Sequence, residues 1–176
     1  MLMAVARSIT RSEARDHEIP EIVMRETNGW VAQDVPPHTF VALAYATLDT
    51  TGRTLSLANA GQLDPLVLRA DGSLEYLTAP GPHLPLGILP DTPYEQASFA
   101  LYPHDLVLFY TDGVVEAQTA GGEMWGFERF EELVQERGHQ LSPDDLITAV
   151  IAAINLFIDH HPQHDDITLV VLQVDA

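Results

Sequence analysis

The chain has 176 residues, 46% of them hydrophobic, which fits one globular domain that buries about 70% of its unfolded surface. Its 26 acidic residues against 8 basic ones give a formal net charge of −18, which argues against nucleic acids and anionic membranes as partners. The absence of cysteine excludes a disulfide framework, a zinc–thiolate site and a thiol nucleophile.

Two helices are expected at the start of the chain. Residues 1–15 carry apolar side chains near helical spacing, and they begin without a capping residue. A second helix begins at Pro20, a residue that suits the first helical turn, and continues to Asp34 with one mostly apolar face. Pro36 and Pro37 end this helix.

The pattern then changes to strands. Residues 40–48 are apolar almost throughout, which predicts a strand buried on both faces. Residues 54–60 alternate apolar and polar side chains and pair with the first strand as a hairpin. We expect residues 66–69 to resume this pairing, and Asp71-Gly72 to turn the chain into a further short strand.

Prolines at five positions between residues 79 and 93 exclude a long helix or a central strand there. This loop is a plain connection or a partner-binding lid. The remaining predicted elements, in chain order, are strands over 94–101 and 106–111, a helix ending at Gly138, a helix starting at Ser142, and a last strand over 167–174.

The order of helices, antiparallel strands, helices and a final strand predicts an α+β fold, in which strands separated by helices share one sheet system. No repeat or linker divides the chain, so we expect a single domain over residues 1–176. No apolar run approaches the ~18 residues of a membrane span and the N-terminus has no signal-peptide pattern. We therefore expect a cytoplasmic protein.

Acidic side chains mark the ends of two predicted strands. Asp112 ends the apolar run LVLFYTDGVVEA of residues 106–117, and Asp165 and Asp166 open the last strand. Strand-end carboxylates that share one cleft would offer the oxygen ligands that Mg²⁺ or Mn²⁺ prefers. The spacing leaves open a plainer interpretation, in which Asp112-Gly113 is an ordinary turn and the two later acids are solvated.

Three histidines, His160, His161 and His164, stand close together near the last predicted helix end. Pro162 interrupts them, and histidines there favour interaction with the helix dipole over a transition-metal cluster.

Taken together, FVALAYATLD, LANAG, LPLGI, LVLFYTDGVVEA and HDDITLVVL resemble, in order and spacing, the bacterial PPM phosphatases. These are the type 2C-like serine/threonine phosphatases of the SpoIIE and RsbU kind. The resemblance implies an antiparallel β-sandwich flanked by antiparallel helix pairs, with a binuclear Mn²⁺ or Mg²⁺ site. It also implies a phosphorylated regulatory protein, of the anti-sigma-factor antagonist type, as the substrate and partner.

The resemblance assigns roles to particular residues. Asp112 and Asp165 match the acidic motifs of the family and become the candidate metal ligands. Gly113 would permit the tight turn, and Asp166 would support the site or remain solvated. Gln62 stands where the family often has histidine, so an acid role there is replaced by, at most, a donated hydrogen bond. Catalysis would need no side chain beyond the metal ligands.

The chain departs from the family pattern at its start, because it begins inside the helix that follows the family's first acidic strands. We therefore expect an N-terminally truncated domain with one weak cation site or none, in place of two cations. An uncovered sheet edge would also pair with a second copy, which predicts a homodimer.

Two functions follow from this resemblance. The first is a metal-dependent protein serine/threonine phosphatase, which hydrolyses phosphoserine or phosphothreonine with a metal-activated water. The second is a catalytically impaired relative that acts as a regulatory protein-binding module.

Overall fold

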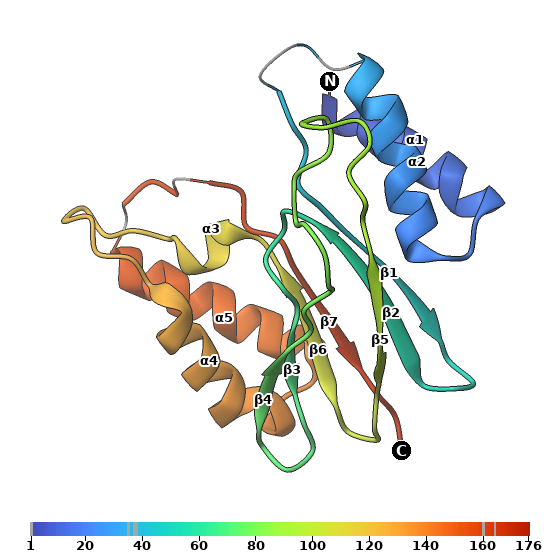
Figure 1. Ribbon diagram of the computed structural model, residues 1–176. Coiled ribbons are helices and arrows are strands. Elements are labelled where there is room, and N and C mark those ends of the chain that lie inside the picture. The colour runs from blue at the N-terminus through green and yellow to red at the C-terminus, as the bar shows by residue number, and fades with distance from the viewer. Residues whose placement is uncertain (1, 35, 37–38, 160, 164) are drawn as a thin grey trace. The chain divides into compact units, whose positions relative to one another are not determined.

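The computed structural model describes residues 2–34, 36, 39–159, 161–163 and 165–176, which form two compact units. The first unit comprises Met1–Asp64 and Leu77–Leu101, and the second comprises Pro65–Tyr76 and Tyr102–Ala176. Each unit holds one antiparallel sheet together with helices (Figure 1). The predicted α+β class, with antiparallel sheets and paired helices, is therefore confirmed.

The first unit begins with two helices and continues into a three-stranded sheet. Its elements are α1 (Leu2–Asp16), α2 (Pro20–Asp34), β1 (Leu43–Asp49), β2 (Thr54–Ala60) and β5 (Gln96–Ala100). The strands follow the order β1-β2-β5, with α2 packed on β1 and β2 and α1 packed on α2. Met24 and Val31 of α2 meet Ala58 and Ala60 of β2 in an apolar core. Both predicted helices and the predicted hairpin are confirmed.

Strand β1 differs from its prediction in burial. Its residues from Leu43 to Thr47 are half-buried, and Leu48 and Asp49 are exposed. Within the described residues β1 is an edge strand that pairs with β2 alone, because β5 lies on the far side of β2. An apolar strand in this position keeps part of its surface open, so the expectation of burial on both faces is wrong.

The second unit contains a four-stranded sheet and the later helices. Its elements are β3 (Leu66–Leu68), β4 (Leu74–Tyr76), β6 (Leu106–Tyr110), α3 (Asp112–Val115), α4 (Gly126–Arg137), the 3₁₀ helix η1 (Gly138–Gln140), α5 (Pro143–Ile158) and β7 (Leu169–Gln173). The strand order is β4-β3-β6-β7. The central strands β3 and β6 carry buried leucines and valines, while α5 packs on β7 and α4.

Strand β3 does not continue the β1–β2 pairing that the sequence suggests. It pairs with β4 through the Asp71-Gly72 turn, where Gly72 has a φ of 86°, and on its other side with β6. The choice of β6 as partner depends on residues about 40 positions away, which local periodicity does not register. The expected resumption of the first pairing is therefore wrong.

Both predicted helix ends in this unit are confirmed. Ser142 caps α5, because its Oγ accepts the backbone N–H of Asp145 at 3.2 Å and Pro143 occupies the first turn. Gly138 is the C-cap of α4, where its N–H donates to the Val134 carbonyl, but its φ of −52° does not require glycine. A side chain at position 138 would instead overlap Leu68, so close packing explains this glycine.

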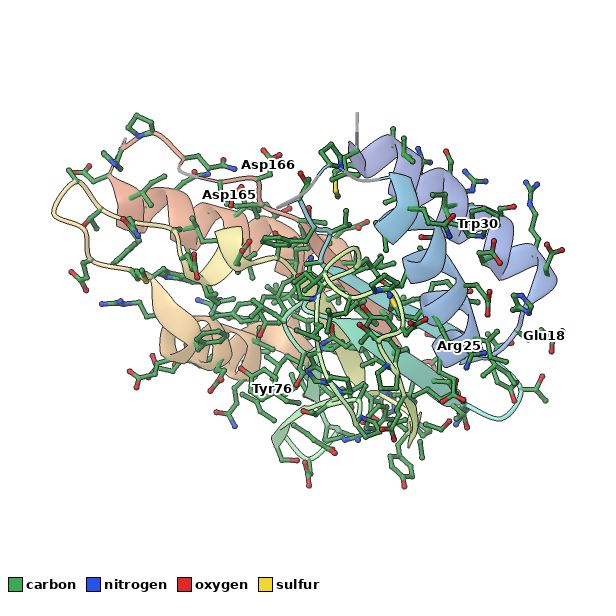
Figure 2. The ribbon with its side chains drawn as sticks, turned by 45° about the horizontal axis from the view of Figure 1, so that its top comes forward. Glu18, Arg25, Trp30, Tyr76, Asp165 and Asp166 are labelled. Atoms are coloured by element: carbon green, nitrogen blue, oxygen red, sulfur yellow. The ribbon has the colours of Figure 1, made fainter. Side chains whose placement is uncertain are left out.

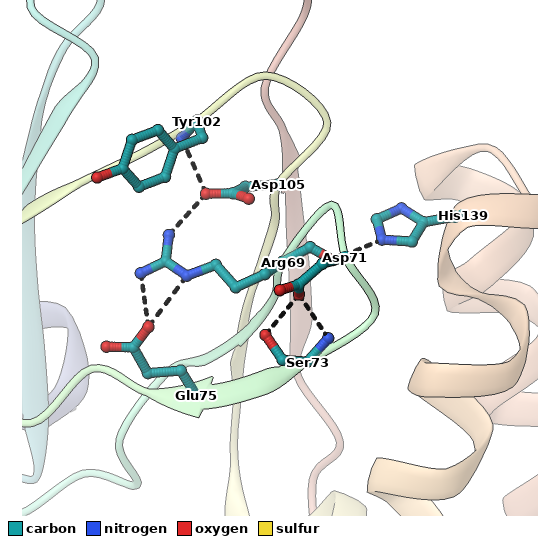
Figure 3. Close-up of polar contacts among 7 residues, drawn as sticks. All are labelled: Arg69, Asp71, Ser73, Glu75, Tyr102, Asp105 and His139. Carbon is teal, nitrogen blue, oxygen red and sulfur yellow. Dashed lines mark hydrogen bonds and ion pairs between the residues drawn. The ribbon is translucent and has the colours of Figure 1, made fainter.

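A buried ion pair joins β3 to the turn before β6 (Figure 3). Asp105 is 1% exposed, and its Oδ2 accepts hydrogen bonds from Arg69 Nη1 at 2.6 Å and from the Tyr102 backbone at 2.9 Å. Arg69 also bonds Glu75 of β4. Burial lowers the pKa of Arg69, but the hydrogen bonds that Arg69 donates to Glu75 and Asp105, together with their negative charges, outweigh it and raise the pKa above its ordinary value.

Candidate functional site

The end of β6 places Asp112 at the start of a single helical turn. Thr111 is still extended, with φ −96° and ψ 163°, and Asp112–Val115 then form α3. The Glu116 N–H closes this turn on the Asp112 carbonyl at 2.8 Å. Asp112 is exposed, and its Oδ1 accepts the N–H of Gly113 at 2.9 Å. The carboxylate is thus held at the strand end by the residue that follows it.

Gly113 is required for a different reason than the sequence suggests. It lies in the helical turn and is not among the described glycines with positive φ, so the turn itself does not demand glycine. A Cβ at position 113 would overlap the carbonyl oxygen of Asp166 and lie 3.0 Å from its carbonyl carbon. The absent side chain therefore allows the backbone before β7 to approach the end of β6.

Asp165 and Asp166 lie in the loop before β7, where both side chains are exposed (Figure 2). The Asp166 N–H donates to Asp165 Oδ1 at 2.7 Å, which repeats the arrangement of Gly113 and Asp112. Gln163 Nε2 donates to the Asp165 carbonyl at 2.6 Å and fixes the loop from the other side.

The two acidic segments lie at the same end of one strand pair. Strands β6 and β7 are antiparallel, with Tyr110 opposite Leu169, so residues that follow β6 are next to residues that precede β7. Backbone bonds continue past the strands, since the Thr111 N–H donates to the Thr168 carbonyl at 3.1 Å. The structure therefore brings Asp112 and Asp165 to neighbouring strand ends.

These carboxylates fit a hydrated cation, although they do not make a complete ligand set. Each Oδ1 is bonded to a backbone N–H, whereas neither Oδ2 accepts a hydrogen bond from another described residue. Among the residues that the structure describes, no group of three His, Asp or Glu side chains is placed to hold a metal ion. Mg²⁺ often uses only one or two carboxylates and completes its shell with water and phosphate oxygens.

A small cavity of about 30 Å³ lies beside Gly113 and Asp165. Glu116, Asn155 and Gln163 contribute polar groups to its wall. This volume has room for about one or two water molecules. Water can therefore reach the Asp165 side of the site within the second unit.

Gln62 belongs to the first unit, in the turn after β2. Its backbone N–H donates to Asn59 Oδ1 at 2.9 Å, and its own Oε1 accepts the Leu63 N–H at 3.3 Å. Gly61 has a φ of 84°, so this turn does require glycine. The described contacts of Gln62 are those of a turn residue, and its supporting role stays a prediction.

The histidine cluster cannot be followed as a group, because His160 and His164 lie outside the described residues. His161 is exposed, and its backbone N–H donates to the Ile158 carbonyl at 2.9 Å beyond the end of α5.

Two residues that position the acids, Thr111 and Gln163, were not found from the sequence. The Thr111 hydroxyl bonds a residue 55 positions away, and the Gln163 amide bonds a residue two positions away. Neither contact gives a periodic pattern in the sequence. Only the position of Thr111, directly before an acid at a strand end, hints at its contact.

The family model of the stage II sporulation protein E (SpoIIE) matches residues 1–175. The chain belongs to the SpoIIE family. The phosphoserine phosphatase RsbU of Bacillus subtilis (strain 168) is 29% identical to this SpoIIE-family chain over 157 residues, which are 88% of the chain and 45% of RsbU. The chain spans less than half the length of the curated relatives it matches.

Solved structures show the same fold as this SpoIIE-family chain. The SiaA-PP2C domain of Pseudomonas aeruginosa has a TM-score of 0.84 at 20% identity, over 99% of this chain and 68% of that one. The RsbU and RsbW domains of Rv1364c from Mycobacterium tuberculosis give a TM-score of 0.82 at 24% identity, over 99% and 47%. The predicted family and fold are therefore confirmed. No helix in the described part of this SpoIIE-family chain is long and apolar enough to cross a membrane.

Proposed function

We propose that this chain is part of a metal-dependent protein serine/threonine phosphatase that hydrolyses phosphoserine or phosphothreonine on a regulatory protein. The observation that carries the proposal is the placement of Asp112 and Asp165 at neighbouring ends of β6 and β7, in a chain of the SpoIIE family. RsbU, a phosphoserine phosphatase by name, aligns over most of the chain and supports the reaction class.

Asp112 and Asp165 would hold Mg²⁺ or Mn²⁺ through their carboxylate oxygens, and Gly113 and Asp166 orient those carboxylates through their N–H groups. A bound cation supplies Lewis acidity toward the phosphoryl group and an activated water. Without cations, the two carboxylates and the net charge of −18 would repel a phosphate dianion. The absence of cysteine fits a mechanism that forms no thiophosphate on the enzyme.

The partner we propose is a phosphorylated protein of the anti-sigma-factor antagonist type, in the cytoplasm. The joint presence of RsbU and RsbW domains in Rv1364c supports a regulatory partner of this kind. The acidic composition, which disfavours nucleic acids, agrees with a protein substrate.

The test is hydrolysis of a phosphoserine peptide and of p-nitrophenyl phosphate with millimolar Mn²⁺. We expect weak Mn²⁺ binding and slow turnover from the 176-residue chain, because two carboxylates leave most of the cation shell to water. Asp112→Asn and Asp165→Asn keep the side-chain shape but remove the charge, and each should lower turnover at least about tenfold. Asp175→Asn, at the exposed C-terminal end, is the matched control and should leave turnover unchanged.

Turnover that needs no divalent cation, or that survives Asp112→Asn, would reject the proposed site. Binding of Mn²⁺ and of a phosphoprotein without hydrolysis would instead indicate the regulatory binding module.

A further inference from the structure

The side chain of Thr111 holds the end of β6 to the loop before β7. Its hydroxyl donates to the Asp166 carbonyl at 3.1 Å and accepts the Thr168 N–H at 2.9 Å. Its backbone N–H adds the bond to the Thr168 carbonyl at 3.1 Å. Thr111, the residue directly before Asp112, thus bonds both ends of the peptide segment 166–168.

This clasp acts on the same carbonyl that Gly113 touches. The Asp166 carbonyl oxygen accepts the Thr111 hydroxyl and lies against the Cα of Gly113, where no side chain would fit. The Asp166 N–H, on the other side of that residue, donates to Asp165 Oδ1. Asp166 therefore links the Asp165 carboxylate to Thr111 and Gly113, the two residues that flank Asp112.

We infer that Thr111 is a positioning residue, whose hydroxyl sets the separation of the Asp112 and Asp165 carboxylates for a divalent cation. This inference rests on the proposed function, because the carboxylates need a set separation only if they share a cation. A hydroxyl that merely ends a strand pair would add stability without affecting cation affinity. Removal of the hydroxyl therefore weakens metal binding if Thr111 positions the carboxylates, and leaves metal binding unchanged if it only stabilises the strand pair.

The experiment measures Mn²⁺ binding to the 176-residue chain by electron paramagnetic resonance, which reports free Mn²⁺ and needs no substrate. Thr111→Val keeps the branched shape and removes the hydroxyl, whereas Thr111→Ser keeps the hydroxyl. Residues that orient metal ligands typically contribute about 10- to 100-fold in affinity, so Thr111→Val should weaken Mn²⁺ binding at least about tenfold. Thr111→Ser should bind Mn²⁺ within about threefold of the unaltered chain.

Thr111→Ala is compared with Thr111→Ser, so that the hydroxyl is tested a second time in a pair that lacks the branch. Thr47→Val is the matched control for loss of a threonine hydroxyl within a strand. It lies in β1, and its hydroxyl forms no hydrogen bond with the residues that the structure describes. Circular dichroism and the urea midpoint confirm that each variant is folded.

The outcomes separate this inference from the function on which it rests. Loss of Mn²⁺ binding in Asp112→Asn, together with unaltered binding in folded Thr111→Val and Thr111→Ala, would overturn the positioning role and leave the proposed site standing. Unchanged Mn²⁺ affinity in Asp112→Asn, or no binding by the unaltered chain, would reject the proposed site and the inference with it. Weak Mn²⁺ binding in Thr111→Val and Thr111→Ala, with normal binding in Thr111→Ser, would support the positioning role of Thr111.

Discussion

The two units hold their loops with different kinds of polar groups. In the first unit neutral amides do this: Asn59 is 2% exposed and bonds Gln62 and Asp64, and Asn28 is fully buried and bonds the 87–90 loop. In the second unit charged groups share this role with the Thr111 hydroxyl: they are the Arg69–Asp105 ion pair and the strand-end acids Asp112 and Asp165.

This difference in polar groups distinguishes turns that are only structural from a turn that is able to bind a cation. The Asn59 amide uses its nitrogen and its oxygen on neighbouring atoms, so little capacity remains for a ligand. Each strand-end aspartate uses one oxygen and leaves the other without a bond from a described residue. The second unit therefore offers the acceptor atoms that a cation requires.

The largest effect should come from the buried charge of the second unit. Arg69→Met leaves Asp105 buried without its charged partner, which should cost about 3–5 kcal/mol in the free energy of unfolding. Urea unfolding, followed by the fluorescence of buried Trp125 in the same unit, measures this loss. Arg11→Met, an exposed arginine on α1, is the control and should cost less than about 0.5 kcal/mol.

The pH dependence of the Arg69 effect sharpens the comparison. Because the pKa of Arg69 is raised in the folded chain, its contribution is present below the ordinary pKa of arginine and lost only above the raised value. The cost of Arg69→Met should therefore be the same at pH 6 and pH 9. A loss below about 1 kcal/mol would show that charge does not hold this unit together.

A smaller effect is expected from the neutral anchor of the first unit. Asn28 donates to the carbonyls of Leu89 and Pro90 at 2.8 Å and accepts the Gly87 N–H at 2.9 Å. Asn28→Ala removes all three hydrogen bonds. Of the three backbone groups, only the Leu89 carbonyl keeps other donors among the described residues, the hydroxyl and N–H of Thr92, and the change should cost about 2 kcal/mol. Asn28→Asp should be no better, because a carboxylate would face two carbonyl oxygens.

Hydrogen exchange read by mass spectrometry locates the Asn28 effect, since peptides of the two units are separated. Exchange should accelerate around residues 84–92 and remain unchanged in the second unit. Gln33→Ala, which removes an exposed bond to Gly29 on the same helix, is the control. Equal acceleration in both units would contradict a local anchor.

The smallest effect is expected at Gln62. The turn depends on the backbone of Gln62 and the side chain of Asn59, whereas the Gln62 side chain makes one 3.3 Å bond to its neighbour. Gln62→Ala should change the free energy of unfolding by less than about 0.5 kcal/mol and leave Mn²⁺ affinity unaltered. A clear loss of Mn²⁺ affinity in this variant would give Gln62 the supporting role that the family pattern suggests.

Local chemistry predicts much of this fold, because helices and hairpins are encoded by nearby residues. Pro20 and Ser142 identify helix starts, and Asp71-Gly72 identifies a hairpin. The partner of β3 was missed, since strand choice depends on residues far along the chain. The sequence suggests that Gly113 permits a tight turn, whereas it allows a close approach by a segment that is distant in sequence.

The candidate site was predicted in part. The acids were found because a carboxylate directly after or before an apolar strand is visible in the sequence. Their common location follows from the β6–β7 pairing, for which the family resemblance was the guide. The groups that orient them, the Thr111 hydroxyl and the backbone N–H groups, depend on interatomic distances and were not visible.

The second unit is built from two separate chain segments, Pro65–Tyr76 and Tyr102–Ala176, and this affects the order in which its strands form during synthesis. Hairpin β3–β4 is complete at residue 76, but β6, the other neighbour of β3, begins at residue 106. At about 5–20 residues per second, roughly 1.5–6 seconds separate the two, and the wait for β7 is longer still. During that interval the apolar strand Leu66–Leu68 has one unpaired edge on a nascent chain. The described strands of the first unit are complete by residue 100, so this sheet can form on the nascent chain before the sheet of the second unit.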